Sequence, residues 1–231
     1  TEIYTLSLHD ALPISFENYS DDYDRWFIDN SSVYAMELDA VRGFIPADKH
    51  GLDIGVGTGK FAIPFGIKIG IDPSFEMAVK AKRSGIDVSL AVAEALPFKD
   101  EVFNFVLMVT SVCFFDDVNA AFNEAFRVLK PGGVIIIGFV DSESELGKRY
   151  IERKERSRFY SDATFYSVPE LTGHLQNSGF SDFEFNQTVF MEEQNSGVRV
   201  RKGYGEGSFV VIKGVKRSEE RRVGKECRSR W

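Results

Sequence analysis

The stretch LDIGVGTG at residues 52–59 constrains what this chain can fold into more than any other part of it. An apolar run leads to an acidic residue, and three glycines then alternate at the point where a strand should turn into a helix. Glycine accepts a positive φ without steric cost and lets the backbone come within contact distance of a ligand. Backbone donors at the N-terminus of the following helix suit a polar or anionic group. The stretch therefore predicts a loop that binds a nucleotide-like cofactor.

Two better-known glycine loops do not fit this stretch. A dinucleotide fingerprint, G-x-G-x-x-G, has Lys60 in place of its third glycine when it is aligned from Gly55. A phosphate-binding loop, G-x-x-x-x-G-K-S/T, anchored on Gly59 has Ile54 in place of its first glycine and Phe61 in place of its hydroxyl residue. What remains is an acidic residue ahead of three glycines, which suits a ligand with a cationic amino group and no phosphates.

A second acidic residue follows at the expected distance. Residues 67–72 read as a strand that ends in Asp72, with Pro73 and then a helix after it. An acid at the tip of the second strand, about 20 residues beyond the glycines, meets ribose hydroxyls in nucleotide-binding sheets. A nicotinamide-dependent enzyme would share this acid, so Asp72 alone does not discriminate between the two classes.

Two further segments complete the pattern. A third strand leads into AEALPF at residues 93–98, and RVLKPGGV at residues 127–134 reads as a helix-to-strand turn. Together with the glycine loop, these segments resemble the class I S-adenosylmethionine-dependent methyltransferases, and the resemblance covers roughly residues 16–213. The family often has an acid just before the alanine of the third-strand segment, where this chain has Val92. Adenine recognition is therefore expected to depend on Glu94 and on the backbone of the alanine.

The resemblance implies S-adenosyl-L-methionine as the cofactor. Asp53 would bind the methionine amino group, directly or through water, and Asp72 the ribose hydroxyls. Met77 would pack on the adenine, and Tyr23 would touch the cofactor from the N-terminal segment; packing within the core is an equally open interpretation for both. The expected cofactor-binding residues are Tyr23, Asp53, Gly55, Val56, Gly57, Asp72, Pro73, Met77, Ala93, Glu94 and Thr110.

Strand-like apolar runs alternate with helical periodicity, which predicts an α/β fold. The helix that precedes Pro131 is expected to begin at Asp116 or Asp117, and residues 60–66 leave room for only a short helix. The resemblance implies a Rossmann-like, seven-stranded, mostly parallel sheet with strand order 3-2-1-4-5-7-6, an antiparallel last strand and helices on both faces. The strands are expected near residues 51–54, 67–71, 86–92, 103–110, 134–140, 182–190 and 207–213.

Both ends look foreign to the fold. Residues 1–15 and 217–231 resemble translated sequencing adaptor, so they are predicted to be non-native or disordered tails. A basic C-terminal arm that binds nucleic acid is the alternative. The domain is then expected to span residues 16–216, with an N-terminal cap at 16–46 and a candidate substrate lid at 142–180.

Composition excludes several functions. Of the charged residues, 22 Lys/Arg and 30 Asp/Glu lie in residues 16–216, a net charge of −8, which disfavours nucleic acid as a substrate. Cys113 is the single cysteine of this domain, so a disulfide framework is not expected and a reducing, cytoplasmic location is. No stretch reaches 18 apolar residues, which predicts no membrane span. Nothing resembles a metal site, and a monomer or homodimer is expected.

The function that the resemblance implies is methyl transfer to oxygen or nitrogen of a small molecule. No catalytic residue can be named: His50 and His174 read as incidental, and Cys113 as a packing residue. The segment that begins at Thr110 also lacks the Asn/Asp-Pro-Pro-aromatic signature of enzymes that methylate base or amide nitrogen. Two alternatives stay open, a cofactor-binding protein of the same fold without transferase activity and a nicotinamide-dependent oxidoreductase.

Overall fold

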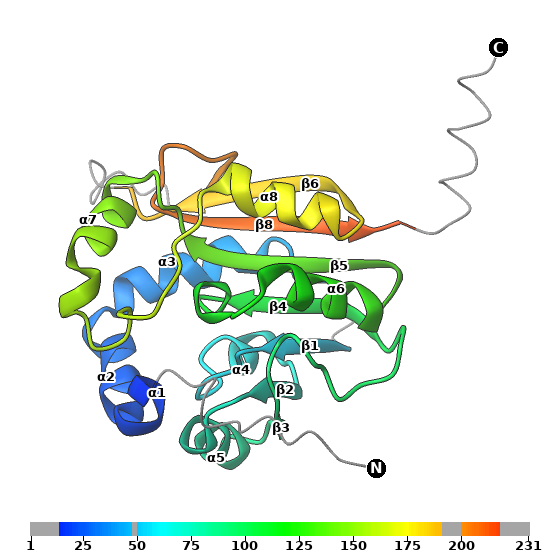
Figure 1. Cartoon of the computed structure of the whole chain (residues 1–231), viewed down its shortest axis with the longest axis horizontal. Coiled ribbons are helices and arrows are strands. Elements are labelled where there is room, and N and C mark those ends of the chain that lie inside the picture. Colours follow the sequence, from blue (N-terminus) through cyan, green and yellow to red (C-terminus); the bar gives the residue numbers. More distant parts are fainter. Residues whose placement is uncertain (1–13, 48–49, 191–199, 218–231) are drawn as a thin grey trace.

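The computed structural model describes residues 14–47, 50–190 and 200–217. This part of the chain forms an eight-stranded sheet with the order β3-β2-β1-β4-β5-β8-β6-β7 (Figure 1). Its strands are β1 (Gly51–Ile54), β2 (Ile69–Asp72), β3 (Asp87–Leu90), β4 (Phe103–Val109), β5 (Leu129–Val140), β6 (Phe180–Thr188), β7 (Arg201–Lys202) and β8 (Phe209–Lys216).

The pairing of the strands confirms the predicted topology. Strands β3, β2, β1, β4 and β5 pair in parallel, and β8 lies antiparallel between β5 and β6. The sixth and seventh predicted strands are β6 and β8, so the order 3-2-1-4-5-7-6 holds. The structure adds β7, a two-residue strand antiparallel to the outer edge of β6. Two residues carry no periodicity from which a strand could be predicted.

Two connections show how local sequence sets the element boundaries. Helix α6 (Val118–Val128) begins as expected at Asp117, whose carboxylate accepts hydrogen bonds from the backbone N–H groups of residues 119 and 120. β5 begins at Leu129 rather than at residue 134, because Leu129 already pairs with Phe103 ahead of a register shift. The short first crossover holds α4 (Ala62–Phe65), a single turn that ends at Gly66 with a φ of 71°.

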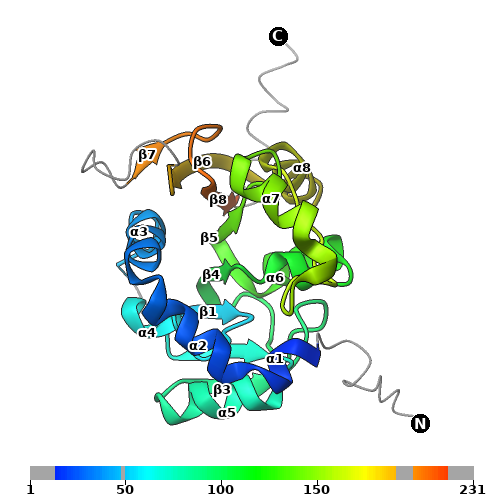
Figure 2. The same ribbon diagram turned by 90° about the vertical axis from the view of Figure 1, so that its left-hand side faces the viewer.

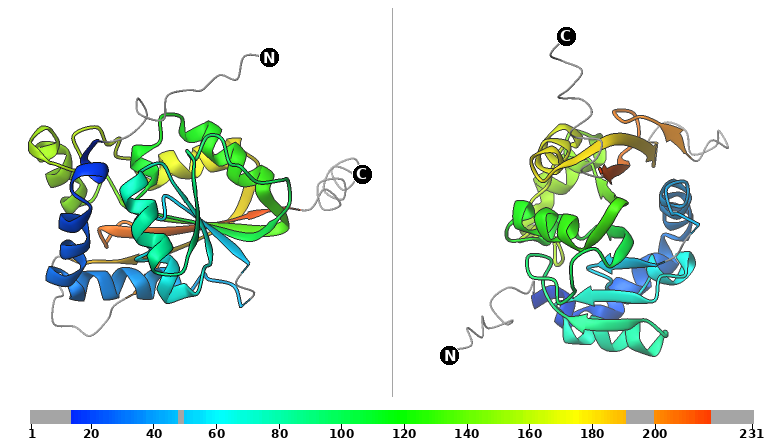
Figure 3. Two further views of the ribbon diagram at one scale, coloured as in Figure 1. Left: turned by 90° about the horizontal axis from the view of Figure 1, so that it is seen from below. Right: turned by 90° about the vertical axis from the view of Figure 1, so that its right-hand side faces the viewer.

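Helices cover both faces of the sheet (Figure 3). α6 and α8 (Val168–Asn177) pack on one face, over a core that includes Leu52 and Ile137. α3 (Ser31–Arg42), α4 and α5 (Phe75–Arg83) bury their apolar residues on the other, around Phe105 and Ile136. Because β4 and β5 are sandwiched between these two layers, they carry the nearly continuous apolar runs seen in the sequence.

A third group of helices lies across the end of the sheet at which the parallel strands finish (Figures 1 and 2). It comprises α1 (Ile14–Asn18), α2 (Ser20–Asp29) and α7 (Glu145–Arg153), and the 3₁₀ turns η1 (Val112–Phe114) and η2 (Lys154–Arg156) complete the list of elements. α1 begins two residues before the predicted start of the domain. At the other end Arg217 pairs with Asp182 at 2.5 Å. The rest of the predicted tails, residues 1–13 and 218–231, lies outside the described residues. No helix of the described chain is long and apolar enough to cross a membrane.

Arg127, in the last turn of α6, holds the loop that follows β3. Its guanidinium pairs with Glu124 at 2.7 Å and with Asp100 at 2.8 Å. It also donates to the carbonyl oxygens of Phe98 (2.8 Å) and Leu96 (3.1 Å). The same side chain therefore pairs with a carboxylate of its own helix and satisfies one carboxylate and two backbone acceptors of a loop without regular secondary structure.

We expect Arg127→Ala to lower the free energy of unfolding by about 1–3 kcal/mol, since it leaves charged and part-buried acceptors without their donor. Lys130→Ala, which removes an exposed cation near the start of β5, is the matched control and should change stability by less than about 0.5 kcal/mol. Urea denaturation of the two variants checks this. Equal effects of the two substitutions would contradict the role given to Arg127.

Candidate active site

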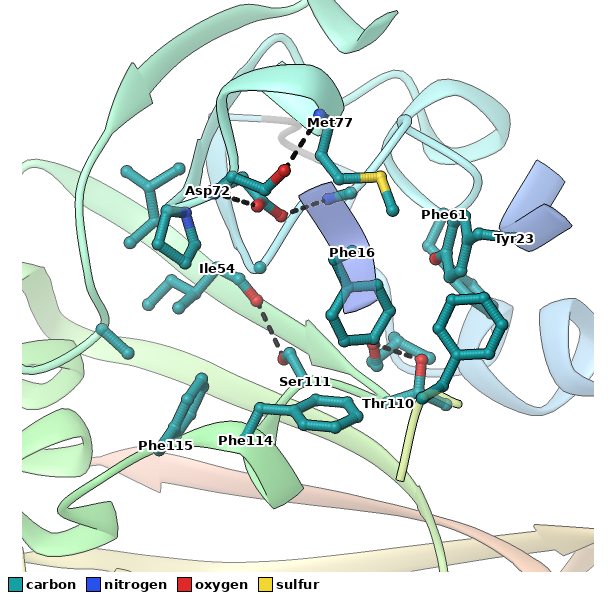
Figure 4. A pocket seen from close by; sticks show the side chains of 18 of the residues that line it. Phe16, Tyr23, Ile54, Phe61, Asp72, Met77, Thr110, Ser111, Phe114 and Phe115 are labelled. Atoms are coloured by element: carbon teal, nitrogen blue, oxygen red, sulfur yellow. Dashed lines mark hydrogen bonds between the residues drawn. The ribbon is translucent and has the colours of Figure 1, made fainter. Parts of the chain in front are cut away.

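A cavity lies at the carboxyl ends of β1 and β4, with an empty volume of about 1410 Å³ that includes its open mouth (Figure 4). These two strands are neighbours, but the chain leaves one toward β2 and the other toward β5, so the strand order reverses here. Open α/β sheets bind ligands at such a point. All of the predicted cofactor-binding residues line this cavity except Asp53 and Val56.

The glycine loop forms one wall of the cavity. Gly55 and Gly57 have φ values of 74° and 54°, in the region that side chains rarely adopt. A Cβ on Gly55 would lie 2.5 Å from the Cβ of Ser111, and a Cβ on Gly57 would lie 3.2 Å from the hydroxyl oxygen of Tyr23. The sequence explained these glycines by the approach of a ligand. The structure adds close contacts within the chain as a reason for each of them.

Asp72, at the end of β2, is tied to the glycine loop. Its Oδ2 accepts a hydrogen bond from the N–H of Gly57 at 2.8 Å, and its Oδ1 accepts one from the N–H of Ser74 at 2.9 Å. Burial raises the pKa of the Asp72 carboxyl to about 6, and the two backbone donors act against this rise. Each carboxylate oxygen keeps further acceptor capacity. Asp72 can therefore hold the loop and accept hydroxyl groups of a ligand at the same time.

The structure does not bring Asp53 to the cavity wall. Asp53 is 2 % exposed, and alternation along β1 turns it away from the sheet face on which Leu52 is buried. Burial, and then the negative charge of Asp72, raises the pKa of the Asp53 carboxyl to about 8. Val56 is also behind the wall, where its side chain covers Gly70 so closely that a Cβ there would lie 2.8 Å from it. A contact of Asp53 with the methionine amino group stays a prediction.

The segments after β2 and β3 also line the cavity. Met77 is 1 % exposed and lines the cavity, so it belongs both to the core and to this wall. The carboxylate of Glu94 accepts hydrogen bonds from the N–H groups of Asp116 (2.9 Å) and Asp117 (3.3 Å). Glu94 thus anchors the start of α6, which is a structural role that the sequence did not indicate.

The end of β4 contributes a strained residue. Thr110 has a φ of 52°, which is uncommon for a β-branched side chain, and its hydroxyl donates to the carbonyl oxygen of Val109 at 2.8 Å. The hydroxyl of Ser111 donates to the carbonyl oxygen of Ile54 at 2.9 Å and so joins the ends of β1 and β4 (Figure 4). Cys113 lies in a smaller neighbouring cavity, where burial raises the pKa of its thiol to about 12. A protonated thiol is a poor nucleophile.

Aromatic rings from distant segments enclose the cavity. Phe16 of α1 lies 4.9 Å from the ring of Phe114 and 5.4 Å from that of Phe159, between centroids. In Figure 4 Phe16 reaches into the cavity above Phe114. Sequence analysis singled out neither Phe16 nor Phe114, because rings that meet in space but not in sequence give no periodic signal. The remaining aromatic residues on the wall are Tyr23, Trp26, Phe27, Phe61, Phe115, Tyr150 and Tyr160.

The charged side chains on the cavity wall are all acidic. They are Glu37, Asp72, Glu94 and Asp116, and the described lining residues include no lysine, arginine or histidine. His50 stacks on Phe103, outside the set of residues that line the cavity. Sequence analysis missed Glu37, which is 6 % exposed and comes from α3. A carboxylate among the inward-facing residues of a helix was the signal that could have identified it.

Side chains fasten the N-terminal helices over the glycine loop. Asp24 of α2 accepts a hydrogen bond from the hydroxyl of Thr58 at 2.7 Å and pairs with Lys60 at 2.9 Å. Glu17 of α1 accepts a hydrogen bond from the hydroxyl of Ser74 at 2.6 Å. The cap thus contacts both the glycine loop and the turn that follows β2.

Comparison with known proteins identifies the family of this fold and cavity. The family described as "Methyltransferase domain" matches residues 52–137. A crystal structure from Thermotoga maritima, described as a SAM-dependent methyltransferase and possible histamine N-methyltransferase, is similar with a TM-score of 0.85 and 46 % identity, over 89 % of this chain and 100 % of that one. The chain belongs to the class I S-adenosylmethionine-dependent methyltransferases. The expected resemblance is confirmed.

Two further proteins are similar to this chain over more than two thirds of its length. An uncharacterized protein of Methanocaldococcus jannaschii is 48 % identical over 202 residues, which cover 87 % of this chain and 98 % of that protein. A ubiquinone/menaquinone biosynthesis C-methyltransferase of Rickettsia felis is 31 % identical over 183 residues, which cover 70 % of this chain and 71 % of that protein.

S-adenosylmethionine is the cofactor of this methyltransferase, and the cavity fits it. The acidic wall suits a ligand that carries positive charge on sulfur and on its amino group. Asp72 has spare acceptor capacity beside the loop, and Gly55 and Gly57 line the cavity with backbone alone. The family assignment decides against the nicotinamide-dependent oxidoreductase. The cofactor contacts of individual residues stay predictions.

We expect Asp72→Ala to raise the dissociation constant of S-adenosylhomocysteine at least tenfold, because the variant loses both the predicted acceptor for ribose and the bond that shapes the loop. Tenfold corresponds to about 1.4 kcal/mol. Glu76→Ala, which removes an exposed carboxylate from the first turn of α5, should leave the constant unchanged. Calorimetric titration measures both. A folded Asp72→Ala protein with wild-type affinity would remove Asp72 from the site.

The buried acids make the stability of the ligand-free protein depend on pH. The pKa of Asp53 rises from 3.8 to about 8 on folding, so the folded state keeps a proton that the unfolded state has lost between these values. Stability therefore falls as the pH rises from about 4 to about 8, by up to about 1.4 kcal/mol per pH unit for one such group. Asp72 and Glu37 shift in the same direction.

Asp53→Asn should flatten this slope between pH 5 and pH 8, and Asp29→Asn, at an exposed position of α2, should not. Urea denaturation at several pH values gives the slopes. If the Asp53→Asn slope equals that of the wild type, the Asp53 carboxyl is not held protonated in the folded protein.

Proposed function

We propose that this methyltransferase transfers a methyl group to nitrogen or oxygen of a small molecule that binds inside the aromatic cavity. The observation that supports this proposal most is the enclosure itself: Phe16, Phe114 and Phe159 cover a cavity that also contains the glycine loop and Asp72. Such a chamber suits a compact apolar acceptor, and the acidic wall disfavours phosphate-bearing substrates such as nucleic acid.

Methyl transfer mainly requires that the protein position the two reactants and exclude water. Bound S-adenosylmethionine supplies a methyl group that is already activated by the positive charge on sulfur. The rings that cover the cavity exclude water, and the walls hold the acceptor in line with the methyl group. A general base is required only for an acceptor that is protonated at the working pH. No residue is assigned that role here.

The two segments that the sequence analysis set apart both supply covering residues. Tyr23 and Phe27 come from residues 16–46, and Tyr150, Phe159 and Tyr160 come from residues 142–180. We assign the first segment as the cap over the cofactor and the second as the lid over the acceptor. The description of the Thermotoga maritima relative as a possible histamine N-methyltransferase supports nitrogen as the atom that is methylated.

A transfer assay with S-adenosylmethionine carrying a labelled methyl group tests the proposal against a panel of small amines, phenols and alcohols. We expect label in at least one acceptor, and Asp72→Ala should lower the rate at subsaturating cofactor at least tenfold. Binding of S-adenosylhomocysteine without turnover across the panel would instead favour a cofactor-binding protein of the same fold.

A further inference from the structure

Glu37 stands apart from the other acids of the cavity because of its position in the fold. It is one of the three buried residues of α3, together with Ala40 and Val41, and it faces the same way as they do. Only 6 % of Glu37 is exposed, yet it lines the cavity. A helix that packs on a sheet through alanine and valine gains no packing stability from a carboxyl beside them, since burial removes the carboxyl from water.

No hydrogen bond or ion pair within the described parts of the chain compensates this burial. Two other acids that line the cavity differ: Asp72 accepts from two backbone N–H groups, and Glu94 accepts from those of Asp116 and Asp117. For Glu37, burial alone raises the pKa of the carboxyl, to about 8. An acid in a cleft whose burial has no structural compensation is a candidate binding residue.

The surroundings of Glu37 place it close to the predicted lid. α3 packs against β5, β6 and β8, whereas the glycine loop and Asp72 follow β1 and β2. After the effect of burial, the Glu37 carboxyl is the next cause that raises the pKa of Tyr150, which belongs to the predicted lid. It also contributes to the raised pKa of Tyr160, where burial is again the main cause. The same carboxyl contributes, after burial and the charges of other acids, to the raised pKa of Tyr23. Glu37 therefore lies near Tyr150 and Tyr160 of the predicted lid as well as near Tyr23 of the cap.

A carboxylate among aromatic rings is the chemistry that recognises an ammonium group. The carboxylate supplies the opposite charge, and the faces of phenylalanine and tyrosine rings attract cations further. The described lining residues contain no lysine, arginine or histidine that would compete for the carboxylate. A neutral alcohol of the same shape would gain neither interaction.

We propose that Glu37 binds the ammonium group of the methyl acceptor, and that the acceptor is therefore a small amine with an apolar or aromatic body. This inference rests on the proposed function and narrows its substrate class. It makes Glu37 the residue that selects amines over alcohols of equal size.

Matched ligand pairs test the proposal. The protein is saturated with S-adenosylhomocysteine and titrated calorimetrically with 2-phenylethylamine and 2-phenylethanol, then with hexylamine and hexanol. At least one amine should bind tenfold or more tightly than its alcohol. Glu37→Gln, which keeps the shape of the side chain, should reduce this ratio to below threefold, and Glu37→Asp should retain part of it.

Asp39→Asn is the control for net charge, because Asp39 lies on the same helix and pairs with Arg42 outside the cavity. It should leave the amine-to-alcohol ratio unchanged. A purely structural Glu37 would alter thermal stability without moving that ratio. The proposal is overturned if no amine is preferred, if Glu37→Gln keeps the preference, or if that variant weakens only S-adenosylhomocysteine.

The transfer assay distinguishes a failure of the role given to Glu37 from a failure of the proposed function. Methylated alcohols without any amine preference would overturn the role of Glu37 and leave the methyltransferase function standing. Amine binding that depends on Glu37, without methyl transfer, would overturn the proposed function and leave the binding site standing.

Discussion

The hydrogen bond between the N–H of Gly57 and the carboxylate of Asp72 is the interaction on which the rest of the site depends. At 2.8 Å it joins the loop after β1 to the end of β2, and the N–H groups of Gly55 and Val56 reinforce it by sharing the carbonyl oxygen of Ile71 at 2.9 Å each. These bonds hold the loop in its unusual backbone geometry and also compensate part of the burial of Asp72. The same bonds therefore fix both the glycine-loop wall of the cavity and the orientation of Asp72.

Sequence predicted what is local or periodic, and it missed what is assembled from distant segments. The strand order, the single-turn α4 and the cap at Asp117 followed from apolar runs, glycine spacing and the family pattern. The position of Asp53 behind the wall could not be predicted, because every residue of β1 is buried and the sequence does not mark which face of the sheet each one turns to. Phe16 was missed because its partners lie about 100 and 140 residues away, and residue spacing along helices and strands says nothing of contacts at that separation.

The charges inside the cavity differ from those around it: the lining holds acids, and the nearby lysines pair with acids of the cap. The carboxyls of Glu37 and Asp72 lie inside without any described cation on the same wall, whereas Lys60 and Lys80 bind the cap from outside. Burial raises the pKa of the Glu37 carboxyl to about 8, so near neutral pH this carboxyl holds a proton and does not add to the repulsion in the ligand-free protein, at the expense of stability in alkaline solution. A cofactor and an acceptor that both carry positive charge would restore the ionised forms, so binding of either ligand should release protons.

The cap helices are fastened to the domain by polar side chains at their edges and by rings beneath them. Lys80 pairs with Asp21 at 2.5 Å and with Asp24 at 3.3 Å, and Asp21 is almost wholly in solvent. Surface pairs of this kind contribute little individually and are screened by dissolved ions. The apolar contacts on the two faces of the sheet are not screened in this way. A high salt concentration should therefore weaken the attachment of α2 at the entrance of the cavity and leave the packing of the sheet unchanged.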